Sequence, residues 1–171
     1  MTAARGDIVD SEGRRIAAST TSYNVVLSKL LMGDEDLDGM LQRIVEMLQA
    51  SGESWNDSLL IGEPDAAGHY EFTAAADSTG DQKALASMKE SLGLQQYATA
   101  DDVMEKLVED YKLEAYPLHW QRVLAGIHYE MQLQAFSNVN NFVMAENVSD
   151  VTVATIKEHS LSLPGVEVST I

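Results

Sequence analysis

Apolar positions in residues 22–52 follow the period of a helix twice, with a short acidic stretch between the two runs. The first run stops at Gly33 and the second at Gly52, and glycine commonly terminates a helix. Two helices joined by so few residues are expected to fold back on each other as an αα-hairpin. The apolar stripes consist of Tyr23, Val26, Leu27, Leu30 and Leu31 in the first run, and of Leu37, Met40, Leu41, Ile44, Met47 and Leu48 in the second.

Helical spacing returns in the middle of the chain and predicts three more helices, over residues 81–92, over residues 99–112 and from Pro117 onward. Thr99 precedes Asp102 by three residues, which is close to a capping box. Pro117 suits a first turn, where its missing N–H is not needed. The last helix has a long stripe that we expect to continue past residue 133, formed by Trp120, Val123, Leu124, Ile127, Met131, Phe136, Val139, Phe142 and Val143.

Alternating patterns and turn residues predict strands elsewhere. Residues 58–61 and 69–73 flank a turn containing Pro64 and Gly68, which suggests a β-hairpin near 58–73. Valine alternates with other residues over 151–154 and again over 166–169, so we expect two or three strands within residues 150–171. Residues 163–165, Leu-Pro-Gly, form the turn between them.

These elements predict an α+β fold, with about five amphipathic helices packed on a small antiparallel sheet. The sheet is expected to combine the hairpin near 58–73 with C-terminal strands from 150–171. Residues 1–20 form a polar N-terminal arm in which 7–9 and 15–17 pair as a short hairpin, and residues 21–171 form a single domain. The predicted core consists of Tyr23, Leu41, Ile44, Leu48, Leu107, Trp120, Leu124, Ile127 and Met131.

Composition restricts the possible partners. The chain has 171 residues, 45% of them hydrophobic, which suits one domain with a core of its own. Its net charge of −16 argues against binding nucleic acid through phosphates and against anionic membrane surfaces. The chain has no cysteine, so disulfides and thiolate chemistry are excluded. The N-terminus has no apolar signal core, and no apolar run reaches the roughly 20 residues of a membrane span, so we expect synthesis in the cytoplasm.

The acidic stretch between the first two helices matches the start of an EF-hand calcium loop. Asp34, Asp36, Asp38 and Gly39 provide alternating carboxylates and the glycine that permits a sharp turn. The twelfth position, where a glutamate should close the site, is Val45. The residues after Gly39 also continue as helix, so we favour Asp34, Glu35 and Asp36 as residues that cap the second helix and suit its positive N-terminal end.

The four histidines, His69, His119, His128 and His159, are the candidate bases or metal ligands. No two of them have the i, i+4 spacing of a helical metal site, and His119 and His128 lie about half a turn out of phase on their helix. Phosphate-binding glycine loops and nucleophile elbows are also missing from the sequence. The sequence therefore identifies no catalytic, cofactor-binding or metal-binding residues.

These patterns predict a non-enzymatic assembly subunit of a larger complex, such as a component of a virus particle. The reasons are the lack of catalytic motifs, the polar termini and the strand segments whose edges need partners. The expected partners are proteins, either neighbouring subunits or further copies of the chain, with no cofactor, nucleic acid or membrane. Two alternatives remain open, a calcium-responsive binding module that uses Asp34, Asp36, Asp38 and Gly39, and a small metal-dependent enzyme.

Overall fold

The computed structural model describes residues 8–9, 15–17, 22–33 and 36–170. Within these residues, six helices pack on a small three-stranded antiparallel sheet, so the predicted α+β class is confirmed. The strands β1 (Ile8–Val9) and β2 (Arg15–Ala17) pair antiparallel, as predicted for the arm. Asp7 of that predicted hairpin and Asp34 of the acidic stretch lie outside the described residues.

The middle strand of the three-stranded sheet is β3 (Tyr23–Leu27), and the sheet order is β4-β3-β5. The prediction of a helix over this segment, and with it the αα-hairpin, is therefore wrong; only the short α1 (Lys29–Met32) is helical. Val25 and Leu27 are fully buried in the core, and Val26, on the opposite face of the strand, is 9% exposed. Three adjacent apolar residues fit a buried strand as well as a helical stripe.

The two outer strands come from the C-terminal third of the chain. β4 (Phe142–Val148) begins with Phe142 and Val143, which we expected to extend the long helix, and β5 (Val166–Thr170) is a predicted strand. Between them lies α6 (Asp150–Glu158), where a strand was predicted. Ser149 explains that error, because its side chain accepts a hydrogen bond from the Thr152 N–H and caps the helix.

The predicted hairpin near 58–73 exists only as an isolated bridge between Ile61 and Phe72. Two backbone hydrogen bonds support it, from Gly62 to Glu71 at 3.0 Å and from Thr73 to Leu60 at 2.9 Å. It is not part of the three-stranded sheet, which corrects the predicted sheet composition. Two short strands cannot hold themselves together in water, and this segment is attached to a helix instead, as described below.

The predicted helices of the middle region are present. They are α2 (Leu37–Ala50), α3 (Thr79–Ser91), α4 (Ala100–Tyr111) and α5 (Leu118–Leu133). The capping box of α4 forms as predicted, with reciprocal bonds between Thr99 and Asp102. α5 stops at Leu133, so its expected extension toward residue 143 is wrong. Most of the predicted core is buried, namely Leu41, Ile44, Leu48, Leu107, Leu124, Ile127 and Met131, whereas Tyr23 and Trp120 are partly buried.

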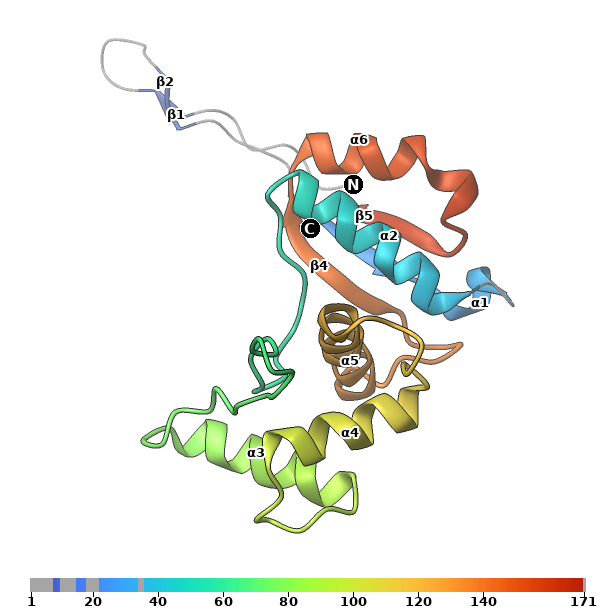
Figure 1. Cartoon of the computed structure of the whole chain (residues 1–171). Coiled ribbons are helices and arrows are strands. Elements are labelled where there is room, and N and C mark those ends of the chain that lie inside the picture. Colours follow the sequence, from blue (N-terminus) through green and yellow to red (C-terminus); the bar gives the residue numbers. More distant parts are fainter. Residues whose placement is uncertain (1–7, 10–14, 18–21, 34–35, 171) are drawn as a thin grey trace.

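Figure 1 shows how these elements are layered. α2 and α6 lie side by side over one face of the sheet, α5 crosses beneath them, and α4 and α3 lie beyond α5. The chain leaves the sheet region after α2 and returns to it through β4. Asn56 marks the point of departure, because its N–H donates to the Met144 carbonyl at 2.7 Å. The segment from Asn56 to the start of β4, which contains α3, α4 and α5, is therefore an insertion between α2 and β4.

Candidate interaction surfaces

A buried arginine fixes the segment that follows α2. Arg122 of α5 makes a two-pronged ion pair with Asp57, at 2.9 and 3.3 Å, and its side chain is only 10% exposed. The same guanidinium donates to the carbonyls of Ile61 and Leu59 at 2.7 and 3.2 Å. A planar guanidinium suits such a set of acceptors. No sequence pattern indicates this role, since Arg122 is one polar residue within an amphipathic helix.

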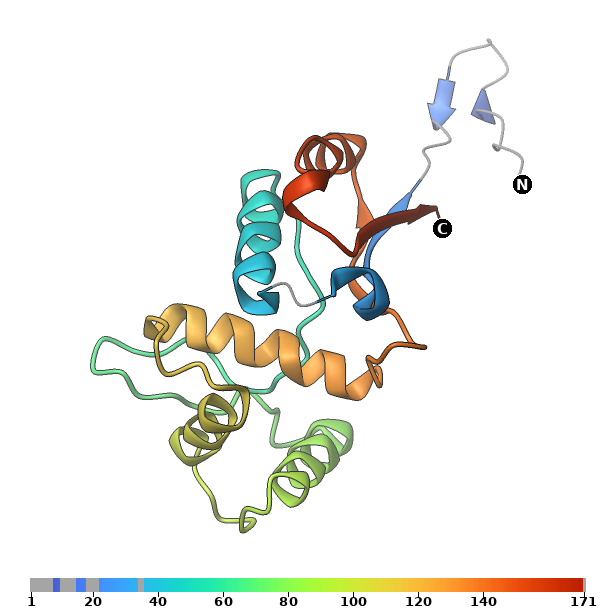
Figure 2. The ribbon, with the colours of Figure 1, turned by 90° about the vertical axis from the view of Figure 1, so that its right-hand side faces the viewer.

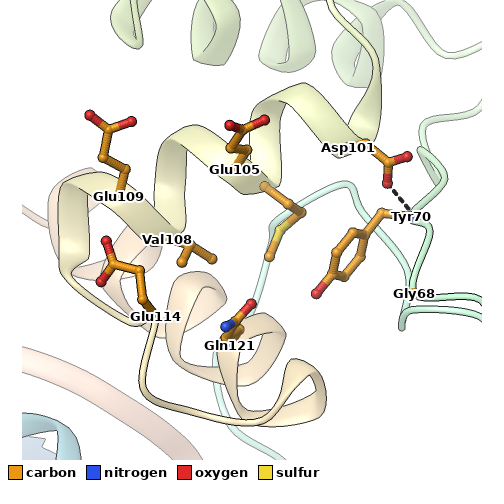
Figure 3. Close-up of a pocket in the computed structure, with 9 residues that line it drawn as sticks. Gly68, Tyr70, Asp101, Glu105, Val108, Glu109, Glu114 and Gln121 are labelled. Carbon is orange, nitrogen blue, oxygen red and sulfur yellow. Dashed lines mark hydrogen bonds between the residues drawn. The ribbon is translucent and has the colours of Figure 1, made fainter.

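Four acidic side chains line a pocket of about 440 Å³ between α4, α5 and the loop around Gly68. Asp101, Glu105 and Glu109 follow one another at intervals of four residues along α4, and Glu114 comes from the loop after it (Figure 3). Like charges at this spacing repel each other. The floor of the pocket is formed by Tyr70, Met104, Val108 and Gln121. The pocket has the charge to attract a cation.

At one end of this acidic pocket, Asp101 ties the loop to α4. Its carboxylate accepts the Tyr70 N–H at 2.7 Å and contacts His69 Nδ1 at 2.9 Å. The bond from the Tyr70 N–H, followed by the bond to His69, lowers the pKa of Asp101 below its usual value. The hydrogen bond to Asp101, and then its charge, raise the pKa of His69. The Asp65 pKa is lowered, first of all by the His69 N–H.

The other histidines do not come together. His119 Nδ1 lies 3.2 Å from Glu63 Oε2, His128 Nε2 lies 2.6 Å from Asp38 Oδ1, and His159 bonds the Thr155 carbonyl in its own helix. The His128 ring also stacks on Tyr111, with 4.6 Å between ring centres. Within the described ranges, no three histidine, aspartate or glutamate side chains are grouped to hold a metal ion.

The described part of the acidic stretch, residues 36–39, lies at the start of α2, and Asp34 and Glu35 lie outside the described residues. Asp36 occupies the N-cap position and Asp38 and Gly39 lie in the first turn, as the interpretation that we favoured requires. The Asp36 side chain makes no capping hydrogen bond, however. The Asp36 carboxylate folds over Gly39, where a Cβ would lie 2.5 Å from Asp36 Oδ2. Asp38 reaches across to His128 on α5. These contacts join the start of α2 to α5.

The two edges of the sheet differ. The β4 edge is covered, because Asn56 bonds the carbonyls of Met144 and Val143, and Gln134 bonds both the N–H and the carbonyl of Val143. Beside β5, by contrast, lies a groove of about 470 Å³. One wall of the groove is β5 and the other is formed by Ile156, Lys157, Ser160 and Leu163 of α6 and its following turn. Sequence patterns could not reveal either edge, since both depend on contacts between distant segments.

The fold and these surfaces define a small α+β domain with an acidic surface and one sheet edge that no described residue covers. Residues 1–171, the whole chain, match the family model described as the penicillin-binding protein dimerisation domain. The chain therefore belongs to this family. The domain is a non-catalytic part of penicillin-binding proteins, which are themselves enzymes. This finding shows that the predicted virus-particle component is wrong. The predicted non-enzymatic subunit is correct only for this domain, because the proteins that contain it are enzymes. The predicted protein partners agree with a dimerisation domain.

One solved structure with similarity is penicillin-binding protein 2B from Streptococcus pneumoniae, strain 5204. It shares 18% identity with a TM-score of 0.32, over 100% of this chain and 25% of that chain. The chain spans about a quarter of the length of that protein. A comparison with curated protein sequences found no match. No helix in the described part of the chain is long and apolar enough to cross a membrane.

Proposed function

We propose that this chain is the domain through which a penicillin-binding protein associates with a second copy of itself. The observation that carries the proposal is the family match over residues 1–171, since the family is described by dimerisation. The work of the domain is then mechanical, in that it brings two enzyme chains together while their chemistry resides elsewhere. The calcium-binding and metal-enzyme alternatives are not needed to account for the family.

The charge of the chain limits where two copies can meet. Each copy carries a net charge of −16, so the copies repel each other at low ionic strength. An interface that buries the acidic pocket of α4 against itself would bring Glu105 and Glu109 of both copies together. Self-association therefore favours a surface with few carboxylates, where apolar side chains and backbone groups make the contacts.

The direct test is the solution mass of the purified chain, measured by sedimentation equilibrium over a range of concentrations. One copy has a mass of 18.7 kDa, and we expect the mass to rise toward twice this value as concentration increases. The measurement belongs at moderate ionic strength, where repulsion between the copies is screened. A mass that stays at one copy throughout, at both moderate and high salt, would contradict the proposed function.

A further inference from the structure

β5 is an edge strand, because β3 pairs with one side of it and no described strand pairs with its other side. Residue Val25 is paired with Val168, and Leu27 with Val166. The Ser28 N–H donates to the Gly165 carbonyl at 2.8 Å, which places a hydrogen-bonded pair at the next position of the same register. Figure 2 shows β5, in dark red, running beside β3.

The alternation of an antiparallel ladder then decides which groups point outward. Because Gly165 bonds inward toward β3, the next residues to do so are Glu167 and Ser169. The backbone groups of Val166, Val168 and Thr170 therefore face away from the sheet. The Val166 N–H is already used by the Leu163 carbonyl at 3.2 Å, but no described residue uses the other outward groups of this edge.

The groove beside this edge has the form that accepts an added strand. Val166 and Val168 are half-buried against the core, and their side chains share a face with Val25 and Leu27 of β3. A strand added to β5 would place its own side chains on that face, next to Ile156 and Leu163 across the groove. Strand addition of this kind combines backbone hydrogen bonds with pockets for alternate side chains.

We infer that the strand that occupies this edge is β5 of a second copy, related by a two-fold axis that passes beside Val168. This inference rests on the proposed self-association and names its surface. In this arrangement the two Val168 residues exchange hydrogen bonds, and the Thr170 N–H of each copy donates to the Val166 carbonyl of the other. The two sheets join into one continuous sheet, and the valine side chains of both copies lie on its core face.

The sequence of β5 suits this pairing with itself. With Val168 on the axis, Glu167 of each copy lies directly opposite Ser169 of the other, so no carboxylate meets a carboxylate. Both residues are exposed, on the face of the sheet away from the core. The pairing therefore avoids the repulsion that makes the rest of this acidic surface a poor interface.

The Ser169→Glu variant tests the inference. In its dimer, the new glutamate of each copy lies opposite Glu167 of the other copy, so two pairs of like charges form. We expect the dissociation constant to rise about tenfold, since like charges directly opposite in a sheet destabilise the pair. Thr73→Glu is the matched control. It adds the same charge at an exposed extended position beside α3, away from β5, and should leave association unchanged. Equal association of Ser169→Glu and the wild-type chain would overturn the inference.

Reversing the charge pattern provides a rescue. Adding Glu167→Lys to Ser169→Glu places a lysine opposite a glutamate at both positions, and association should return to wild-type strength or beyond. Glu167→Lys alone is the control for the less negative net charge of the chain. In this variant the lysine lies opposite Ser169, so no new ion pair forms. If the double variant associates no better than Ser169→Glu, the paired register is wrong.

Cross-linking gives a measurement that does not depend on charge. The chain has no cysteine, so Ser169→Cys introduces the single thiol. The two copies of residue 169 are diagonal neighbours in the proposed pairing, about 7–8 Å apart, and a short bis-maleimide should join them. Thr73→Cys should yield no cross-linked dimer. A wild-type chain that stays monomeric would contradict the proposed function itself, whereas a wild-type dimer in which Ser169→Cys does not cross-link overturns only the β5 interface.

Discussion

Gly126 of α5 is required by the ion pair that it faces. A Cβ at this position would lie 2.5 Å from Asp57 Oδ2 and 2.6 Å from Arg122 Nη1. Both atoms belong to the buried cluster that holds residues 57–61 against α5. Neither side chain can move away without breaking its hydrogen bonds. Glycine is thus retained here in the interior of a helix, where it is otherwise unfavourable.

The Gly126→Ala variant should destabilise the chain by about 1–3 kcal/mol, which is the usual cost of adding a methyl group to a packed site. The sign of the change in unfolding free energy is informative. Helix propensity alone favours alanine over glycine by up to about 1 kcal/mol, so destabilisation would come from the contact with the ion pair. Gly80→Ala in α3 is the control. The nearest atom that its Cβ would meet is Ser78 Oγ at 3.9 Å, so this variant should be neutral or slightly stabilising. Denaturant unfolding of both variants measures the difference, and a stabilised Gly126→Ala would show that the cluster yields easily.

Residue patterns predicted the burial of side chains better than they predicted the secondary structure of the same residues. Leu41, Ile44 and Leu48 were assigned correctly because α2 is covered on one face only, and one-sided burial produces a clear helical period. Val25 and Val26 were misread because Val25, Val26 and Leu27 are consecutive apolar residues, so the segment shows no alternation that would indicate a strand. The partners of Arg122 lie more than fifty positions away in the sequence, so no local pattern contains them.

Among the elements, the loop before the bridge residue Phe72 is held by charge. His69 and Tyr70 attach to Asp101 at the start of α4. The raised pKa of His69 means that its contribution is complete below the ordinary value of 6.5 and is lost as pH rises through the higher folded value. The lowered pKa of Asp101 means that its contribution is complete above 3.8 and is lost as pH falls through the lower folded value.

This attachment should therefore be strongest between about pH 4 and 6.5. NMR titration of the His69 ring should give a pKa above 6.5, and hydrogen exchange of the Tyr70 amide should speed up, relative to the intrinsic rate, as pH rises beyond that value. In the Asp101→Asn variant the His69 pKa should fall back toward its ordinary value. An unchanged His69 titration in Asp101→Asn would show that other charges, such as that of Asp65, set its pKa.

Elements were predicted reliably where caps and periods agree. Thr99 and Asp102 mark the start of α4 by side-chain chemistry that a sequence displays directly. Ser149 begins α6 by the same chemistry, but the alternating valines at 151 and 153 favoured a strand, and tertiary packing of Val153 and Ile156 against the core decided for the helix. The edges of the sheet, one covered by Asn56 and Gln134 and one open at β5, follow only from the assembled fold.

At the scale of the whole molecule, charge and association oppose each other. Two copies with a net charge of −16 each repel, and salt shortens the range of that repulsion from about 30 Å at 0.01 M to about 8 Å at 0.15 M. An interface made of backbone hydrogen bonds and valine side chains loses little to salt. We therefore expect self-association to strengthen about tenfold over this range. Sedimentation at both concentrations measures the change, with sucrose in place of salt as the control. Weaker association at higher salt would indicate that ion pairs hold the interface.

The order of the sheet also determines how the chain must fold. Val25 of β3 pairs with Ala145 on one side and with Val168 on the other, so the central strand is synthesised long before either neighbour. Contacts between such distant residues form slowly, because the intervening chain must first be brought together. The inserted α3–α5 region has a local capping box and its own buried contacts. It can therefore become ordered before β3 has its partner strands β4 and β5. Residues 23–27 are thus the segment that a nascent chain must keep from pairing with another chain, and the sheet closes last.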